Sequence, residues 1–255
     1  MKKRHAVAVL VGVGVLAVVV VPSLPRIRQD PSVHQYADQR SWLGVPFTLD
    51  VLSNLPFVAA GLAGFLRLRD CDRLRPRWLW AVLFLGIALT GFGSAYYHWQ
   101  PNNETLVWDR LPMTIVFTTF LAAMICERID ERAGRLLILP LLAVGFLSVW
   151  SWHRSEMRGA SDLRFYGLVQ FLPMFIIPAM AMLFPPRYTR NRDLCLIFSW
   201  YALALVFQVT DAPVYKFLGF VSGHTLKHLC AAVAAWQIVR TLTSQKAPVA
   251  VERKV

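Results

Sequence analysis

The sequence predicts an all-α, polytopic membrane protein with a seven-transmembrane-helix core and one extra hydrophobic helix at the N-terminus. The chain of 255 residues is 56% hydrophobic and only 16% charged, whereas a typical soluble domain has about 25% charged residues. The apolar residues lie in long blocks, and uncharged blocks of about 18 residues or more are typical of membrane spans. Because a spanning segment must satisfy its own backbone hydrogen bonds, these blocks are expected to be helices.

Eight apolar segments are separated by short loops: 6–22, 51–67, 78–98, 111–127, 135–152, 164–184, 194–210 and 219–239. The first segment follows a basic start and resembles a signal peptide. No convincing cleavage site follows it, so we favour an uncleaved anchor over a cleaved signal segment. We therefore divide the chain into an N-terminal membrane anchor and outer linker (1–50), a seven-helix domain (51–240) and a cytoplasmic tail (241–255).

The basic residues indicate the orientation of these helices. The formal net charge is +12, which in a soluble protein would suggest nucleic acid, but no nucleic-acid motif is found. Most basic residues fall in alternate loops and at the two ends of the chain, in 2–4, 67–77, 128–135, 187–192 and 240–254. By the positive-inside rule both termini are expected in the cytoplasm. The four cysteines form no CxxC motif, so we expect neither a disulfide framework nor a thiolate metal site.

Five polar residues lie at the same end of the predicted spans. Ser94 and His98 are near the outer end of segment 78–98, Asp109 opens the following helix, and His224 and His228 open the last one. Ionisable groups at membrane depth are costly and therefore point to function. The predicted topology puts all five at similar depth near the outer face, which favours one shared site.

The spacing of these residues suggests a catalytic metal site. His224 and His228 are four residues apart, so they share one face of a helix and are about 6 Å apart along its axis. Two such imidazoles can chelate one ion, with His98 as a third ligand from a facing helix. Three protein ligands leave a position for water, as in catalytic zinc sites, and zinc lowers the pKa of that water to about 7. Asp109 can bond the water or carry its proton, and Ser94 shares a face with His98.

Each of these residues also has a structural explanation. The HxxxH spacing is weakly specific on its own, and Ser94 lies in a small-residue run that lets helices pack closely. Asp109 could cap a helix that begins near Leu111, and His98 could be an interfacial histidine. The shared depth favours the functional interpretation. Lys227, between the two histidines, is expected to point off the metal face or to snorkel outward.

Four motifs together resemble the alkaline ceramidase family, which belongs with the adiponectin and progestin receptors to a superfamily of seven-helix intramembrane hydrolases. They are SNLPF at 53–57, GSAYYHW at 93–99, WDRLPM at 108–113 and HTLKH at 224–228. The resemblance covers about 50–240. It implies zinc held by His98, His224 and His228, with Ser94 and Asp109 beside the reactive water. The implied substrate is a membrane lipid, either ceramide or a related N-acyl lipid, cleaved at its amide bond to a fatty acid and a sphingoid base or other amine.

Two departures from the family pattern refine these expectations. Eukaryotic members have an acidic calcium-binding stretch before the first core helix, whereas 34–50 contains only Asp38 and Asp50 as acids, and Phe47 stands at the expected acidic position. This weighs against calcium as a cofactor. The extra N-terminal segment and the compact loops suggest a bacterial relative in the inner membrane, with the metal site near the periplasmic side.

Two other functions compete with the hydrolase. The superfamily includes receptors, so a non-catalytic seven-helix receptor or sensor with a structural metal site is the main alternative. A transporter ranks lower, because the sequence has neither an inverted repeat nor paired broken helices.

Overall fold

The computed structural model describes residues 3–71 and 74–243. Its helices are α1 (Lys3–Val20), α2 (Thr48–Leu52), α3 (Leu55–Arg67), α4 (Arg77–Trp99), α5 (Asn103–Arg128), α6 (Glu131–Met157), α7 (Arg164–Leu183), α8 (Asn191–Val209), α9 (Asp211–Leu218) and α10 (Gly223–Thr243). The described residues form no strand beyond one isolated bridge, between Trp42 and Val45. The predicted all-α class is confirmed.

Seven helical stretches of the described chain are long and apolar enough to cross a membrane. They are Lys3–Ser23, Thr48–Asp70, Arg77–Trp99, Asn103–Arg128, Glu131–Met157, Arg164–Leu183 and Asn191–Val209. The helix α10 is not in this set, and it carries two histidines and a lysine in its first turns. Large apolar side chains on α1 face outward, and Leu16 is 61% exposed, as expected for a surface in contact with lipid. The chain is an integral membrane protein.

Three predicted helix boundaries differ from the structure. Segment 51–67 is two helices, α2 and α3, which meet at Ser53 and Asn54 just before Pro56. The segment predicted to begin near 111 begins at Asn103, because the side chain of Asn102 accepts hydrogen bonds from the N–H groups of Glu104 and Thr105. The interpretation of Asp109 as a helix cap is therefore wrong. The last segment, predicted over 219–239, is α10 with α9 before it.

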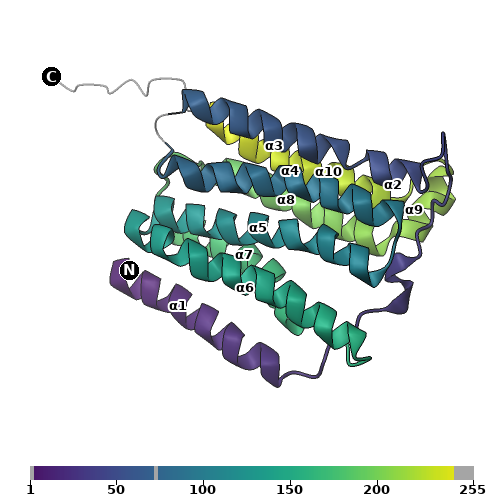
Figure 1. The fold of residues 1–255 in the computed structure, drawn as a ribbon. Helices are drawn as coiled ribbons and strands as arrows, with labels where there is room; N and C mark the ends of the chain where they lie inside the picture. Colours follow the sequence, from purple (N-terminus) through teal and green to yellow (C-terminus); the bar gives the residue numbers. More distant parts are fainter. Residues whose placement is uncertain (1–2, 72–73, 244–255) are drawn as a thin grey trace.

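Six helices form a closed ring. Around it, α3 packs on α4, α4 on α5, α5 on α7, α7 on α8, α8 on α10, and α10 back on α3. The helix α6 packs outside this ring on α5 and α7, and α1 packs on α7 at the edge of the bundle (Figure 1). A ligand-binding cavity can therefore form in the interior of the ring.

The helices begin and end at two opposite ends of the bundle. The helix α1 begins and α10 ends at one end, while α2 and α9 lie at the other (Figure 1). Of the predicted cytoplasmic tail, residues 241–243 continue α10 and residues 244–255 lie outside the described residues. The side of the membrane that each end faces stays a prediction.

Two glycines bring α4 close to its neighbours. A Cβ at Gly91 would lie 2.7 Å from Val58 Cγ2, and a Cβ at Gly93 would lie 2.0 Å from the carbonyl oxygen of Trp108. Pro112 has no N–H to donate to that carbonyl, so the Trp108 carbonyl lacks its usual hydrogen bond within α5. With Gly91 against α3 and Gly93 against α5, the next residue, Ser94, faces the interior of the ring.

Candidate metal centre

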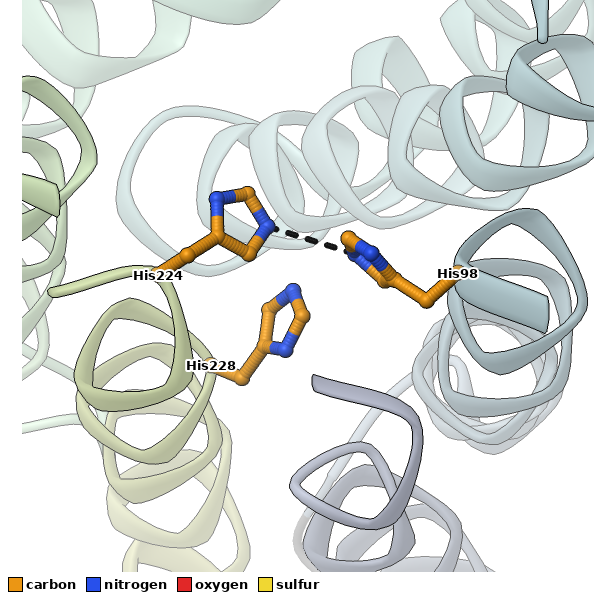
Figure 2. A group of neighbouring side chains, drawn as sticks. All are labelled: His98, His224 and His228. Atoms are coloured by element: carbon orange, nitrogen blue, oxygen red, sulfur yellow. Dashed lines mark hydrogen bonds between the residues drawn. The ribbon is translucent and has the colours of Figure 1, made fainter. Parts of the chain in front are cut away.

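Three buried histidines meet at the α2–α9 end of the bundle. His98 comes from the last turn of α4, and His224 and His228 come from the first two turns of α10 (Figure 2). One ring nitrogen from each histidine lies within 4.8 Å of the other two. The Nε2 atoms of His98 and His224 are 3.2 Å apart. The structure thus brings together the three residues predicted as metal ligands.

The geometry of this cluster fits a metal ion. Two nitrogens bound tetrahedrally to zinc at 2.0–2.1 Å lie about 3.3 Å apart, close to the observed separation of 3.2 Å between His98 and His224. The Nε2 atom of His228 is buried and has no hydrogen-bond partner among the described residues. A buried nitrogen with an unused lone pair, facing two other imidazoles, is the donor arrangement that a divalent ion requires.

Ser53 orients one of these histidines. Its Oγ lies 2.8 Å from Nδ1 of His228 and 3.1 Å from the carbonyl oxygen of Asp50. The carbonyl can only accept, so the single hydroxyl proton of Ser53 goes to Asp50 and the hydroxyl oxygen accepts from the Nδ1–H of His228. This tautomer leaves the lone pair of His228 on Nε2, the nitrogen that faces the other two histidines. The sequence motif SNLPF included Ser53, but nothing in the local sequence indicated this contact.

Asp211 holds the start of α10 in place. One of its carboxylate oxygens accepts from the backbone N–H of His224 at 2.7 Å, and the other accepts from the N–H of Ala37 at 2.9 Å. One side chain therefore connects α9, the linker between α1 and α2, and the first turn of α10.

The linker covers the histidine end of the ring. The ring of Tyr36 packs edge-on against His224 and His98, with centroids 4.5 Å and 4.7 Å away. Burial, followed by the nearby Tyr97, raises the pKa of the Tyr36 hydroxyl above its ordinary value. The linker thus shields the cluster from bulk water.

A second contact fastens the linker. Burial raises the pKa of the Asp38 carboxyl, but the hydrogen bonds and charge of Arg40 outweigh it, so the net pKa lies below the ordinary value. Arg40 also donates to the carbonyl oxygen of Phe220 at 2.6 Å. This contact ties the linker to the segment between α9 and α10.

A cavity of about 520 Å³ occupies the interior of the ring. Four predicted site residues line its polar end: Ser94, Asp109, His224 and His228. His98 reaches this end through its contact with His224. Most of the remaining lining is apolar and includes Phe117, Phe120, Ile177, Phe198 and Ile238. An apolar cavity with a few converging polar groups is the usual form of a small-molecule site, and this one suits a lipid chain.

The position predicted for Lys227 is wrong. Its Nζ lies 3.4 Å from Nε2 of His224, and the side chain lines the cavity. Residues three apart share a helix face, so Lys227 points the same way as His224 rather than away from it.

The two acids near the linker have partners of their own. Asp50 accepts from the hydroxyl of Thr225 at 2.6 Å and from that of Ser222 at 3.3 Å, and Asp38 pairs with Arg40. The ring of Phe47 packs on Tyr36, with centroids 5.8 Å apart. Among the described residues, the metal-ligating side chains that gather closely enough to hold an ion are the three histidines.

Comparison with known proteins identifies the family of the chain. No curated protein matches the sequence. The family model described as Ceramidase matches residues 48–247, a range that contains α2 to α10 and all five predicted site residues. Because the match covers well over half of the 255 residues, the chain belongs to the ceramidase family.

Proposed function

We propose that the protein is a zinc-dependent intramembrane amidohydrolase. Its substrate is ceramide or a related N-acyl lipid, which it cleaves to a fatty acid and a sphingoid base or other amine. The observation that carries the proposal is the cluster of three buried histidine nitrogens beside Ser94 and Asp109, at the polar end of an apolar cavity. Membership of the ceramidase family supports the same reaction class.

The histidines provide the metal site. His98, His224 and His228 would hold zinc through their ring nitrogens, with Ser53 keeping His228 in the correct tautomer. When bound, zinc supplies a Lewis acid and a water of lowered pKa.

The other residues position the lipid and move protons. With the acyl chain in the apolar part of the cavity, the amide group lies at the polar end beside Ser94 and Asp109. Asp109 accepts a proton from the attacking water and passes it to the amine nitrogen as the C–N bond breaks. Ser94 donates a hydrogen bond to the carbonyl oxygen as negative charge develops there. The water's oxygen and one proton end on the fatty acid, and its other proton ends on the amine.

We further propose that the protein lies in a bacterial inner membrane with both termini in the cytoplasm and the metal site near the periplasmic side. The basic loops support this orientation. In this arrangement 1–50 anchors and covers the 51–240 domain, because Tyr36 and Ala37 of the linker contact residues of the site.

The test combines metal content with turnover. Purified wild type should contain about one zinc per chain, and His224→Ala/His228→Ala should lose it. The matched control, His5→Ala, changes an exposed histidine on α1 and should keep the metal. Absence of zinc from wild type, or undiminished zinc in the double variant, contradicts the metal assignment.

Turnover is followed by mass spectrometry of fatty acid and amine released from N-acyl lipids, ceramides included. Asp109→Asn should keep zinc but lower turnover by about 100-fold to 10,000-fold, the range for loss of a general acid–base group. The control Glu104→Gln makes the same chemical change at an exposed position of α5 and should be neutral. Bound zinc without cleavage of any lipid by wild type would favour the receptor or sensor.

A further inference from the structure

Arg110 is a buried cation at the polar end of the cavity, and the proposed reaction does not use it. It follows Asp109 on α5, lines the same cavity and is only 8% exposed. Its Nη1 is buried without a hydrogen-bond partner among the described residues. A guanidinium keeps its charge at every physiological pH, so Arg110 places a permanent cation in the wall of the cavity.

The neighbours of Arg110 do not supply the missing acceptors. Its guanidinium stacks over the rings of Trp152, at 4.0 Å from the centroid, and Tyr166, at 4.9 Å. Aromatic faces attract a cation, but they do not satisfy its N–H donors. The nearby acids are Asp109 and Glu156, yet no ion pair within 4.0 Å involves Arg110 in the part of the chain that the structure describes.

Arg154 also stacks on an aromatic ring, but it does not line the cavity. It lies over the ring of Trp150, 4.8 Å from the centroid, but its side chain is exposed. Solvent or lipid head groups therefore supply acceptors to Arg154, whereas Arg110 can obtain them only from an occupant of the cavity. A buried cation that no carboxylate contacts directly is unfavourable, and an anionic group bound in the cavity would lower that cost.

The charged residues that line the cavity also support an anionic ligand. Histidines and tyrosines aside, the ionisable side chains that line the cavity in the described chain are Asp109, Arg110 and Lys227. Asp109 has the proton-transfer role proposed above. Arg110 is therefore available to a ligand, and Lys227 adds a second basic side chain at the histidine end.

We propose that, among N-acyl lipids, the protein prefers those that carry a carboxylate on their amine half, as an N-acyl amino acid does. This inference rests on the proposed function. Arg110 and Asp109 are adjacent on α5 and line the same cavity, so a single bound lipid can contact both side chains. Since the acyl chain occupies the apolar part of the cavity, the anion belongs to the amine half. A carboxylate matches the guanidinium fork with two parallel hydrogen bonds.

The experiment compares two lipids with the same acyl chain, one on glycine and one on ethanolamine. The first ends in a carboxylate and the second in a hydroxyl. Wild type should favour the glycine conjugate in kcat/KM, and Arg110→Gln should reduce that preference by about tenfold to a hundredfold, the range for a charge-assisted hydrogen bond. Arg110→Lys keeps a point charge and should fall between them. Arg154→Gln is the matched control and should keep the wild-type preference.

Binding is measured separately from turnover. Displacement of a fluorescent fatty-amide probe from wild type by the two lipids reports their relative affinity even if neither is cleaved. Cleavage of ceramide but of neither conjugate overturns the carboxylate proposal and leaves the proposed function standing. Cleavage of no N-acyl lipid, ceramide included, contradicts the proposed function. Equal displacement by both lipids, or an equal preference in wild type and Arg110→Gln, overturns the carboxylate proposal.

A last measurement tests whether Arg110 recognises the substrate or the fatty-acid product. The fatty acid released by the reaction also carries a carboxylate, so its inhibition constant is measured for wild type and Arg110→Gln. If the substitution relieves fatty-acid inhibition but leaves the preference between the two conjugates unchanged, Arg110 recognises the product and the proposal is wrong. If Arg110→Gln does not fold, the wild-type preference and Arg110→Lys still decide the question.

Discussion

At the scale of single residues, hydrogen bonds to the histidines determine which nitrogen is free to bind a metal. Ser53 accepts from Nδ1 of His228 because its own proton is committed to the Asp50 carbonyl. The free lone pair is then on Nε2, toward His98 and His224. Partners of this kind typically change metal affinity by about tenfold to a hundredfold.

Ser53→Ala should therefore weaken zinc binding by about tenfold to a hundredfold, since His228 loses the acceptor that selects its tautomer. Competition with a chromophoric chelator measures this affinity. Ser148→Ala is the matched control, because Ser148 is also buried but bonds only the Gly145 carbonyl within its own helix. Unchanged affinity in Ser53→Ala would show that the tautomer does not depend on this hydroxyl.

At the scale of elements, α4 positions Ser94 by packing tightly on both sides. The interpretation of GFGSA as a close-packing run and that of Ser94 as a site residue are compatible, because Gly91 and Gly93 contact the neighbouring helices while Ser94 lines the cavity.

Gly93→Ala should destabilise the protein by about 1–3 kcal/mol, the usual range for overpacking, because the new Cβ would overlap the Trp108 carbonyl. It should also lower turnover by displacing α5, which carries Asp109. The thermal midpoint in detergent and the turnover number measure the two effects. Gly12→Ala has open space around it and should be neutral or slightly stabilising. Equal midpoints for the two variants would mean that α4 and α5 do not need this approach.

Another element-scale contact fastens the segment that follows α1 to the start of α7. Arg164 donates to the carbonyl oxygens of Pro22 and Leu24 and pairs with Asp162 at 2.7 Å. The hydrogen bond from Arg164 lowers the pKa of Asp162 below its ordinary value.

The pH dependence of stability tests this contact. A carboxyl whose pKa is lowered by folding stabilises the native state above its unfolded pKa of about 4, and this contribution is lost as pH falls through the folded pKa. The midpoint difference between wild type and Asp162→Asn should thus be constant near neutral pH and shrink below about pH 4. A difference that stays constant down to strongly acidic pH would show that the ion pair contributes nothing.

At the scale of the whole molecule, the ring encloses the cavity while the basic loops lie at the end away from the histidines. Predicted orientation can be tested with a membrane-impermeant maleimide on intact cells, in a Cys195→Ser parent because Cys195 is exposed. Ser41→Cys, in the linker at the histidine end, should be labelled, and Arg192→Cys, at the opposite end, should be labelled only after lysis. Both positions are exposed, so the reverse pattern would invert the topology.

The local sequence predicted more of the site than of its surroundings. The His224–His228 spacing and the shared depth of His98 selected three residues that the structure brings together. The contacts of Ser53 and Arg110 could not be predicted, because each depends on a segment distant in the sequence. The correct position of Lys227 could have been predicted from the sequence, because a residue three positions after His224 shares its helix face.

Helical class, membrane location and family follow from composition, long apolar blocks and four short motifs, because hydropathy and motif spacing are properties of contiguous residues. The closed ring, the tautomer of His228 and the unpartnered guanidinium of Arg110 emerge only when the helices pack. Those features depend on which faces meet across the bundle, and no contiguous stretch of the chain carries that information.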